Sequence, residues 1–146
     1  MPVRLPITVS ILLLIWALLF PAAPMARAAD GELFRSDSKR FGNPKMDIVL
    51  TEIDRQPRTS ILEVQITHIG SSVGSSFFFL CSIRDLARQR GHFRYIAKAE
   101  EQPRHHQMLV GFLNGPTEEP ARLDQRLAGQ PVIDLDYFAP ICDKMQ

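Results

Sequence analysis

The stretch that decides the fold is residues 75–91, which read SSFFFLCSIRDLARQRG. Three consecutive phenylalanines favour a strand in its first half. Helical spacing outweighs them, because apolar side chains recur on one face of a helix and charged ones lie largely opposite. The apolar positions are Phe79, Leu80, Ile83, Leu86 and Ala87, and the polar positions are Arg84, Asp85, Arg88 and Gln89. The sequence therefore predicts one main helix, capped by Ser75 or Ser76 and ended at Gly91.

Two segments on each side of this helix alternate apolar and polar residues, as half-buried strands do. Before the helix, the alternation covers residues 46–54 and 61–69, with a turn at Pro57 between them. After the helix, it covers residues 93–100 and 108–113. The first pair is predicted to form an antiparallel hairpin, since a short polar turn joins two such runs.

The remaining segments are shorter and more polar. Residues 29–45 carry glycine and proline breakers, so they are predicted to be a flexible lead-in to a single domain over residues 46–146. Thr117 and Pro120 are placed to open a short charged helix that ends near Ala128. Residues 131–138 are apolar enough for a short edge strand, and a tail follows. The order β-β-α-β-β-α predicts an α+β fold, a small and mostly antiparallel sheet with the main helix packed on one face.

The amino end has the three parts of a secretory signal peptide. Arg4 supplies a positive charge, and an uncharged run of 14 residues follows over 7–20. This run is shorter than the roughly 20 residues that span a bilayer. Ala26-Arg27-Ala28 then gives the small-x-small pattern of a cleavage site. We expect residues 1–28 to be removed, with cleavage after Ala29 or retention as an anchor as the alternatives, and the mature chain to be periplasmic or secreted.

Charge and length limit what the mature chain does. Removing residues 1–28 takes away two of the 17 basic residues and none of the 16 acidic ones, which leaves a formal charge of −1. Nucleic-acid binding and a polybasic membrane patch are therefore not expected, because both require a basic surface. A chain of this length supports one domain with a modest core.

Both cysteines, Cys81 and Cys142, survive the predicted cleavage. An exported chain meets an oxidising compartment, so the sequence predicts a disulfide between them. Closing a loop of about 62 residues stabilises a fold by roughly 4 kcal/mol in the chain-entropy model. The alternative is two free thiols, with Cys81 buried as a small apolar residue.

The sharpest match to a catalytic motif is GSSVG at residues 70–74, which fits the G-x-S-x-G pattern of a nucleophile elbow between a strand and a helix. Ser72 would be the nucleophile. The candidate bases are His92, His105 and His106, and the candidate orienting acids are Asp85 and Asp124. The elbow normally stands on a large parallel sheet, which this chain is too short to build. The same segment is also a simple connector or a weak anion site at a helix start.

Metal binding is a second chemical hypothesis. His105 and His106 are adjacent, with Met108 nearby, and could hold a soft or borderline ion. Three or four ligands at recognisable spacing are absent from the sequence. His68 and His92 are isolated and are interpreted as strand or turn residues. The acidic pairs Glu100-Glu101 and Glu118-Glu119 are neighbours in sequence, and a glycosidase needs acids that face each other across a cleft. No cofactor is expected.

Residues 78–95, FFLCSIRDLARQRGHFRY, resemble a pattern in small exported bacterial proteins and lipoproteins of uncharacterised function. In that pattern an apolar helix ending A-x-x-x-G leads into an aromatic strand. Ala87 and Gly91 stand at the small positions, and Phe93 and Tyr95 at the aromatic ones. This chain lacks the lipid-attachment cysteine that many of those proteins carry. The resemblance implies an envelope location and a small α+β fold, with no catalytic residues to carry over.

Together these observations predict a non-enzymatic exported domain that acts as an interaction or accessory subunit for a partner in the bacterial envelope. A small secreted serine hydrolase that uses Ser72 is the first alternative. A metal-binding envelope protein that uses His105 and His106 is the second.

Overall fold

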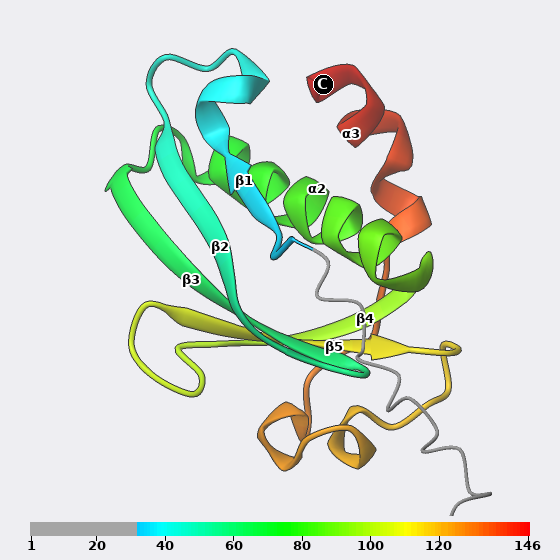
Figure 1. The fold of residues 1–146 in the computed structure, drawn as a ribbon. Coiled ribbons are helices and arrows are strands. Elements are labelled where there is room, and N and C mark those ends of the chain that lie inside the picture. The colour runs from blue at the N-terminus through cyan, green and yellow to red at the C-terminus, as the bar shows by residue number, and fades with distance from the viewer. Residues whose placement is uncertain (1–31) are drawn as a thin grey trace, which may run out of the picture. The chain divides into compact units, whose positions relative to one another are not determined.

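Within residues 32–146, which the computed structural model describes, six strands form one curled antiparallel sheet (Figure 1). The strands are β1 (Arg35–Asp37), β2 (Asp47–Gln56), β3 (Thr59–His68), β4 (Tyr95–Glu100), β5 (Gln107–Leu113) and β6 (Ile133–Asp134). Their order across the sheet is β1-β2-β3-β5-β4-β6. The α+β class and the antiparallel sheet are confirmed. The signal peptide predicted over residues 1–28 lies outside the described part of the chain.

The main helix, α2 (Ser72–Gly91), runs along one face of the sheet (Figure 1). It begins one turn earlier than predicted, because Ser71 caps it by accepting a hydrogen bond from the amide of Gly74 at 3.0 Å. The predicted stop at Gly91 is confirmed, and His92 follows it with a left-handed φ of 59°. No helix in residues 32–146 is both long and apolar enough to cross a membrane.

The core lies between α2 and the sheet. One cluster joins the helix to the central strands and consists of Leu62, Ile83, Leu86, Ala87, Ile96, Met108, Val110, Phe112 and Leu135. A second joins the amino half of the helix to β2 and consists of Met46, Ile48, Leu50 and Phe78. The alternation expected along β2 is therefore confirmed, since Met46, Ile48 and Leu50 are all buried.

The amino-terminal lead-in is more ordered than the sequence suggested. Residues 35–37 form β1, which pairs with residues 49–51 of β2, and a 3₁₀ turn, η2 (Ser38–Phe41), follows. The hydroxyl of Ser38 is buried there, where it donates to the carbonyl of Met46 at 3.1 Å and accepts from the amide of Ile48 at 2.9 Å. A strand of three mostly polar residues has no readable alternation, which explains why the prediction of a flexible lead-in was wrong here.

The opposite face of the sheet is covered by two 3₁₀ turns, η3 (Pro120–Arg122) and η4 (Gln125–Leu127), where one short helix was predicted. The prediction fails at Asp124, whose backbone is extended and whose carboxylate caps the second turn by accepting from the amide of Arg126. Leu127 from η4 is fully buried against β4 and β5.

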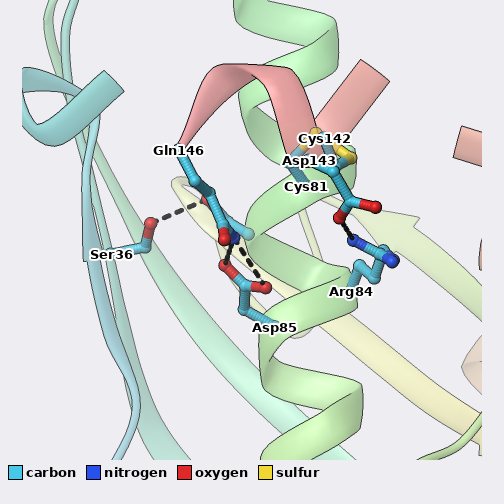
Figure 2. The surroundings of a disulfide bond; sticks show 8 residues. Ser36, Cys81, Arg84, Asp85, Cys142, Asp143 and Gln146 are labelled. Carbon is cyan, nitrogen blue, oxygen red and sulfur yellow. Dashed lines mark hydrogen bonds and ion pairs between the residues drawn. A yellow bond between two sulfur atoms is a disulfide. The ribbon is translucent and has the colours of Figure 1, made fainter. Parts of the chain in front are cut away.

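The carboxyl end folds back onto α2. After β6 come a 3₁₀ turn, η5 (Leu135–Phe138), and a short helix, α3 (Ala139–Met145), where a tail was predicted. Figure 2 shows the predicted disulfide, with Cys81 and Cys142 joined at an S–S distance of 2.08 Å. Beside it, Arg84 donates to Asp143 at 2.9 Å and Gln146 donates to Asp85 (Figure 2). Helix α3 therefore buries Arg84, which the sequence had assigned to the polar face.

Close packing of β5 against η4 gives a direct test of this layer. A Cβ added at Gly111 would lie 2.5 Å from Cδ1 of Leu127, whose side chain is fully buried. We expect Gly111→Ala to lower the free energy of unfolding by roughly 1–3 kcal/mol, the usual range for overpacking. Denaturant unfolding would measure it, with Gly115→Ala as the matched control, because nothing lies within 4 Å of a Cβ there. Equal stability of the two variants would contradict the packing.

Candidate functional site

A pocket of about 160 Å³ opens where β3, α2 and the loop between β4 and β5 meet. We call it the loop pocket. Its apolar wall consists of Val64, Ile66, Phe79 and Met108, and its polar rim consists of Glu100, Glu101, His106 and Gln107. Typical small-molecule pockets measure about 300–1,000 Å³, so this volume suits a single side chain of a larger partner.

The loop pocket lies beside an open edge of the sheet. The pairing of β3 with β5 ends at Glu63 and Gln107, and one more hydrogen bond joins the amide of Val64 to the carbonyl of His106 at 2.8 Å. Strand β3 continues to His68, paired with β2 alone. The register with β2 is irregular here, because Ile48 pairs with Ile66 while Asp47 pairs with His68. Within the described residues, no strand pairs with residues 65–68 of β3 on the β5 side. Figure 1 shows β2 and β3 curving away from β4 and β5 at this end.

Three ligand-type side chains gather on the rim. One atom each from Glu101, His105 and His106 lies within 4.8 Å of the others, and all three residues are exposed. The two imidazole rings are 3.8 Å apart between centroids. Neighbouring residues of a strand point to opposite faces, but His106 has a left-handed φ of 60°, which turns the chain and brings the rings together. The structure thus unites the two histidines named from sequence and adds Glu101, which had been set aside as half of an acidic pair.

Backbone hydrogen bonds hold this loop in shape. The amide of Gln102 donates to the carbonyl of Gln107 at 3.1 Å, and the amide of Gln107 donates to the carbonyl of Arg104 at 3.1 Å. The carboxylate of Glu101 also contacts the imidazole of His105 directly. The rim of the loop pocket is therefore a defined turn fastened to β3 and β5.

Ser72, the candidate nucleophile, is the first residue of α2 and is exposed. Its hydroxyl forms no hydrogen bond within residues 32–146, and its carbonyl accepts hydrogen bonds from the hydroxyls of Ser75 and Ser76. His92 lies at the other end of the 20-residue helix, about 30 Å away at 1.5 Å per residue. A catalytic base at His92 is therefore out of reach of the Ser72 hydroxyl.

The two acids proposed to orient a histidine have other partners. Asp85 accepts hydrogen bonds from Gln146 (Figure 2), and Asp124 accepts two from the guanidinium of Arg126. Within residues 32–146, no histidine is hydrogen-bonded to the Ser72 hydroxyl or to either of these acids.

A buried ionic cluster, which sequence reasoning missed, lies between the sheet and the carboxyl end of α2. The carboxylate of Glu52 is fully buried and accepts hydrogen bonds from Ser60 Oγ at 2.7 Å, Arg55 Nε at 3.0 Å and Arg90 at 3.2 Å. It also accepts from the backbone amide of Phe34 at 3.0 Å. Burial raises the pKa of Glu52, but the hydrogen bonds from Arg55, Phe34 and Ser60 outweigh it and lower the pKa below its usual range.

Arg90 supplies the helix side of this cluster. Its guanidinium contacts the hydroxyl of Ser60 and the carbonyls of Gln56 and Thr59, and it stacks over the ring of Phe112 at 5.0 Å. Among residues 32–146, every buried side-chain nitrogen and oxygen has a hydrogen-bond partner. The cluster therefore ties the end of α2 to the β2–β3 turn.

A second ion pair joins the β2–β3 turn to the segment that follows β5. Arg58 donates to both carboxylate oxygens of Glu118, at 2.8 and 2.6 Å, and to the carbonyl of Phe112. These hydrogen bonds lower the pKa of Glu118 to about 2. Glu118, which the sequence analysis names only as half of an acidic pair, fastens the segment after β5 to the β2–β3 turn.

Comparison with protein-family models, curated proteins and solved structures finds no match for this chain. The fold and the site define the protein as a small, disulfide-bonded α+β domain with an apolar pocket beside an open sheet edge. The resemblance to small exported bacterial proteins stays a prediction.

The Glu52 cluster gives a pH-dependent prediction. Breaking a buried ion pair by neutralising one partner costs about 3–5 kcal/mol, so we expect Glu52→Gln to lower the free energy of unfolding by roughly that amount at neutral pH. The pKa of Glu52 is lower in the folded state than in the unfolded state. The carboxylate therefore contributes fully to the free energy of unfolding above the unfolded-state pKa of 4.5, and this contribution is lost as pH falls through the folded-state pKa.

The difference between wild type and Glu52→Gln should therefore shrink as pH drops below 4.5. Urea unfolding at several pH values would measure it. Glu63→Gln is the control, since Glu63 forms no ion pair within the described residues. A difference that stays constant from neutral pH to strong acid would contradict the assigned role of the carboxylate.

Proposed function

We propose that the mature chain is a non-enzymatic interaction domain, exported to the periplasm or the cell exterior, that binds an extended peptide segment of an envelope partner. The observation that carries this proposal is the loop pocket beside the open edge of β3. A strand of a partner that pairs with such an edge gains main-chain hydrogen bonds, and pockets for its alternate side chains give specificity.

The geometry suits one short strand. Beyond Val64, β3 has no partner strand within the described residues on the side where β5 has ended, and a peptide would pair with β3 there. The side chain of Ile66 lines the loop pocket together with Phe79 and Met108. Side chains of a strand alternate between its two faces, so an added strand would turn one apolar side chain into the pocket and its neighbours away from it.

Exposed apolar residues support a contact surface at this end of the molecule. Ile66, Ile69 and Val73 follow one another from the end of β3 to the first turn of α2, with exposed fractions of 48%, 52% and 64%. Large apolar side chains exposed together often mark an interaction site. A partner strand along β3 would cover Ile66 first.

The non-enzymatic part of the proposal rests on how the ionisable groups are used. The buried carboxylate of Glu52 pairs with the guanidinium of Arg90, which also donates to the carbonyl of Thr59. Ser72 stands at the exposed start of α2 without a histidine or acid hydrogen-bonded to its hydroxyl in the described residues. These groups serve the fold, which favours binding over chemistry.

Peptide binding can be tested with a displayed library of random peptides selected on the folded protein. We expect peptides with one apolar residue in an extended motif, and a loss of affinity of about tenfold or more in Ile66→Glu, because a charge would enter an apolar wall. Ile53→Glu is the matched control, since Ile53 is equally apolar and 43% exposed but lies on β2, outside the pocket.

Titration of a selected peptide by calorimetry would give the affinities, and amide exchange would report whether the Ile66 amide becomes protected. Equal binding by Ile66→Glu and wild type, or equal loss in Ile53→Glu, would contradict the proposed surface.

The export part of the proposal draws on the disulfide. Cys81 and Cys142 are both fully buried in their bonded form, and a structural disulfide is compatible with an oxidising compartment. The bond fastens α3 to the middle of α2, where α3 also holds Arg84 through Asp143.

Mass spectrometry of the native protein tests export and oxidation together. We expect Ala29 as the first residue, because the signal peptide is cut after Ala28. We also expect a mass two hydrogens below that of the reduced chain, because forming the Cys81–Cys142 bond removes two hydrogens. Free-thiol labelling before and after reduction is the control. A chain that begins at Met1 with two reactive thiols would contradict the proposal.

A further inference from the structure

We infer that Glu101, His105 and His106 form a surface site for a divalent first-row transition metal ion. The inference rests on the side chains of the β4–β5 loop and does not require that the loop pocket bind a peptide. Two imidazoles and a carboxylate are ligands that suit copper, zinc and nickel. Among these ions the affinity order of such nitrogen and oxygen sites places Cu²⁺ highest.

The distances fit a single ion. Metal bonds to imidazole nitrogen and carboxylate oxygen are about 2.1 Å, so two ligands of one ion lie at most about 4.2 Å apart. The three candidate ligand atoms lie within 4.8 Å of one another before any ion draws them together. All three residues are exposed, so small rotations of their side chains close the remaining gap.

The backbone of the β4–β5 loop already holds the two histidines close together. The left-handed backbone of His106 places its ring beside that of His105, with 3.8 Å between centroids. The carbonyl of His106 is held by the amide of Val64, and residues 102 and 107 are joined across the loop. Holding ligands in place before binding reduces the entropy that binding must overcome.

The site would keep open coordination positions. Three protein ligands leave at least one position of a four-coordinate ion for water or another molecule. Glu101 and His106 also line the loop pocket, so an ion held by them would stand at its mouth. A molecule in the pocket could then supply the next ligand.

Titration of the full mature protein with Cu²⁺ and, separately, with Zn²⁺ tests the site, without any affinity tag. We expect one bound ion per chain and an electron paramagnetic resonance spectrum of the Cu²⁺ form with coupling to two imidazole nitrogens. His105→Ala and His106→Ala should each weaken binding by about tenfold or more and reduce the coupling to one nitrogen. Glu101→Gln should weaken binding while keeping both nitrogens.

Two matched controls keep the test specific. His68→Ala removes an exposed histidine of β3, and Glu100→Gln removes the glutamate next to Glu101, which pairs with Lys98 instead. Both should bind the ion as wild type does. Unchanged affinity in the double variant His105→Ala/His106→Ala, or an equal loss in His68→Ala, would overturn the inference, and circular dichroism would verify that each variant is folded.

Discussion

The buried carboxylate of Glu52 is the constraint on which the rest of the structure depends. It receives hydrogen bonds from the segment before β1, from β2, from β3 and from the end of α2, through Phe34, Arg55, Ser60 and Arg90. A buried charge that loses a partner costs several kcal/mol, so these four segments are stable only when they are assembled together. Burial of the apolar clusters stabilises the fold but requires no specific direction of contact. The hydrogen bonds of Glu52 are directional, so they fix the position of the end of α2 on the sheet.

The position of the helix in turn creates the loop pocket. Arg90 fixes the carboxyl end of α2 on the β2–β3 turn, and the disulfide at Cys81 fixes its middle to α3. The amino half of α2 is left to pack over the far end of β3, where Phe79 becomes one wall of the pocket. The opposite wall belongs to β5, which starts only at Gln107 while β3 runs on to His68. The pocket and the open edge thus share one cause, the difference in length between two paired strands.

Periodicity was enough to predict the helix, the four long strands and the α+β class, because each long element buries one regular face. The same alternation contained the signal that was missed: Met46, Ile48 and Leu50 are buried, and Glu52 continues their series. A charged residue in a buried register indicates a buried partner, which in the structure is Arg90 at the end of α2. Short elements carry too few residues to show a period, so β1 and the 3₁₀ turns η3 and η4 could not be predicted. His105 and His106 were visible in the sequence, but the left-handed turn at His106 that joins them was not.

The open edge beside the loop pocket is short, and its shortness bears on what can bind there. A long, flat sheet edge is a site for self-association, and proteins limit such edges with short strands and charges. Here the carbonyl of His106 already accepts a hydrogen bond from the amide of Val64. The unpaired edge that remains is therefore centred on Ile66, and Glu100 and Glu101 line the pocket beside it. Continuous pairing with a second copy would need more unpaired backbone than this. A short extended peptide would gain affinity from one apolar side chain as well as from backbone pairing. The short edge and the pocket together are enough to bind such a peptide.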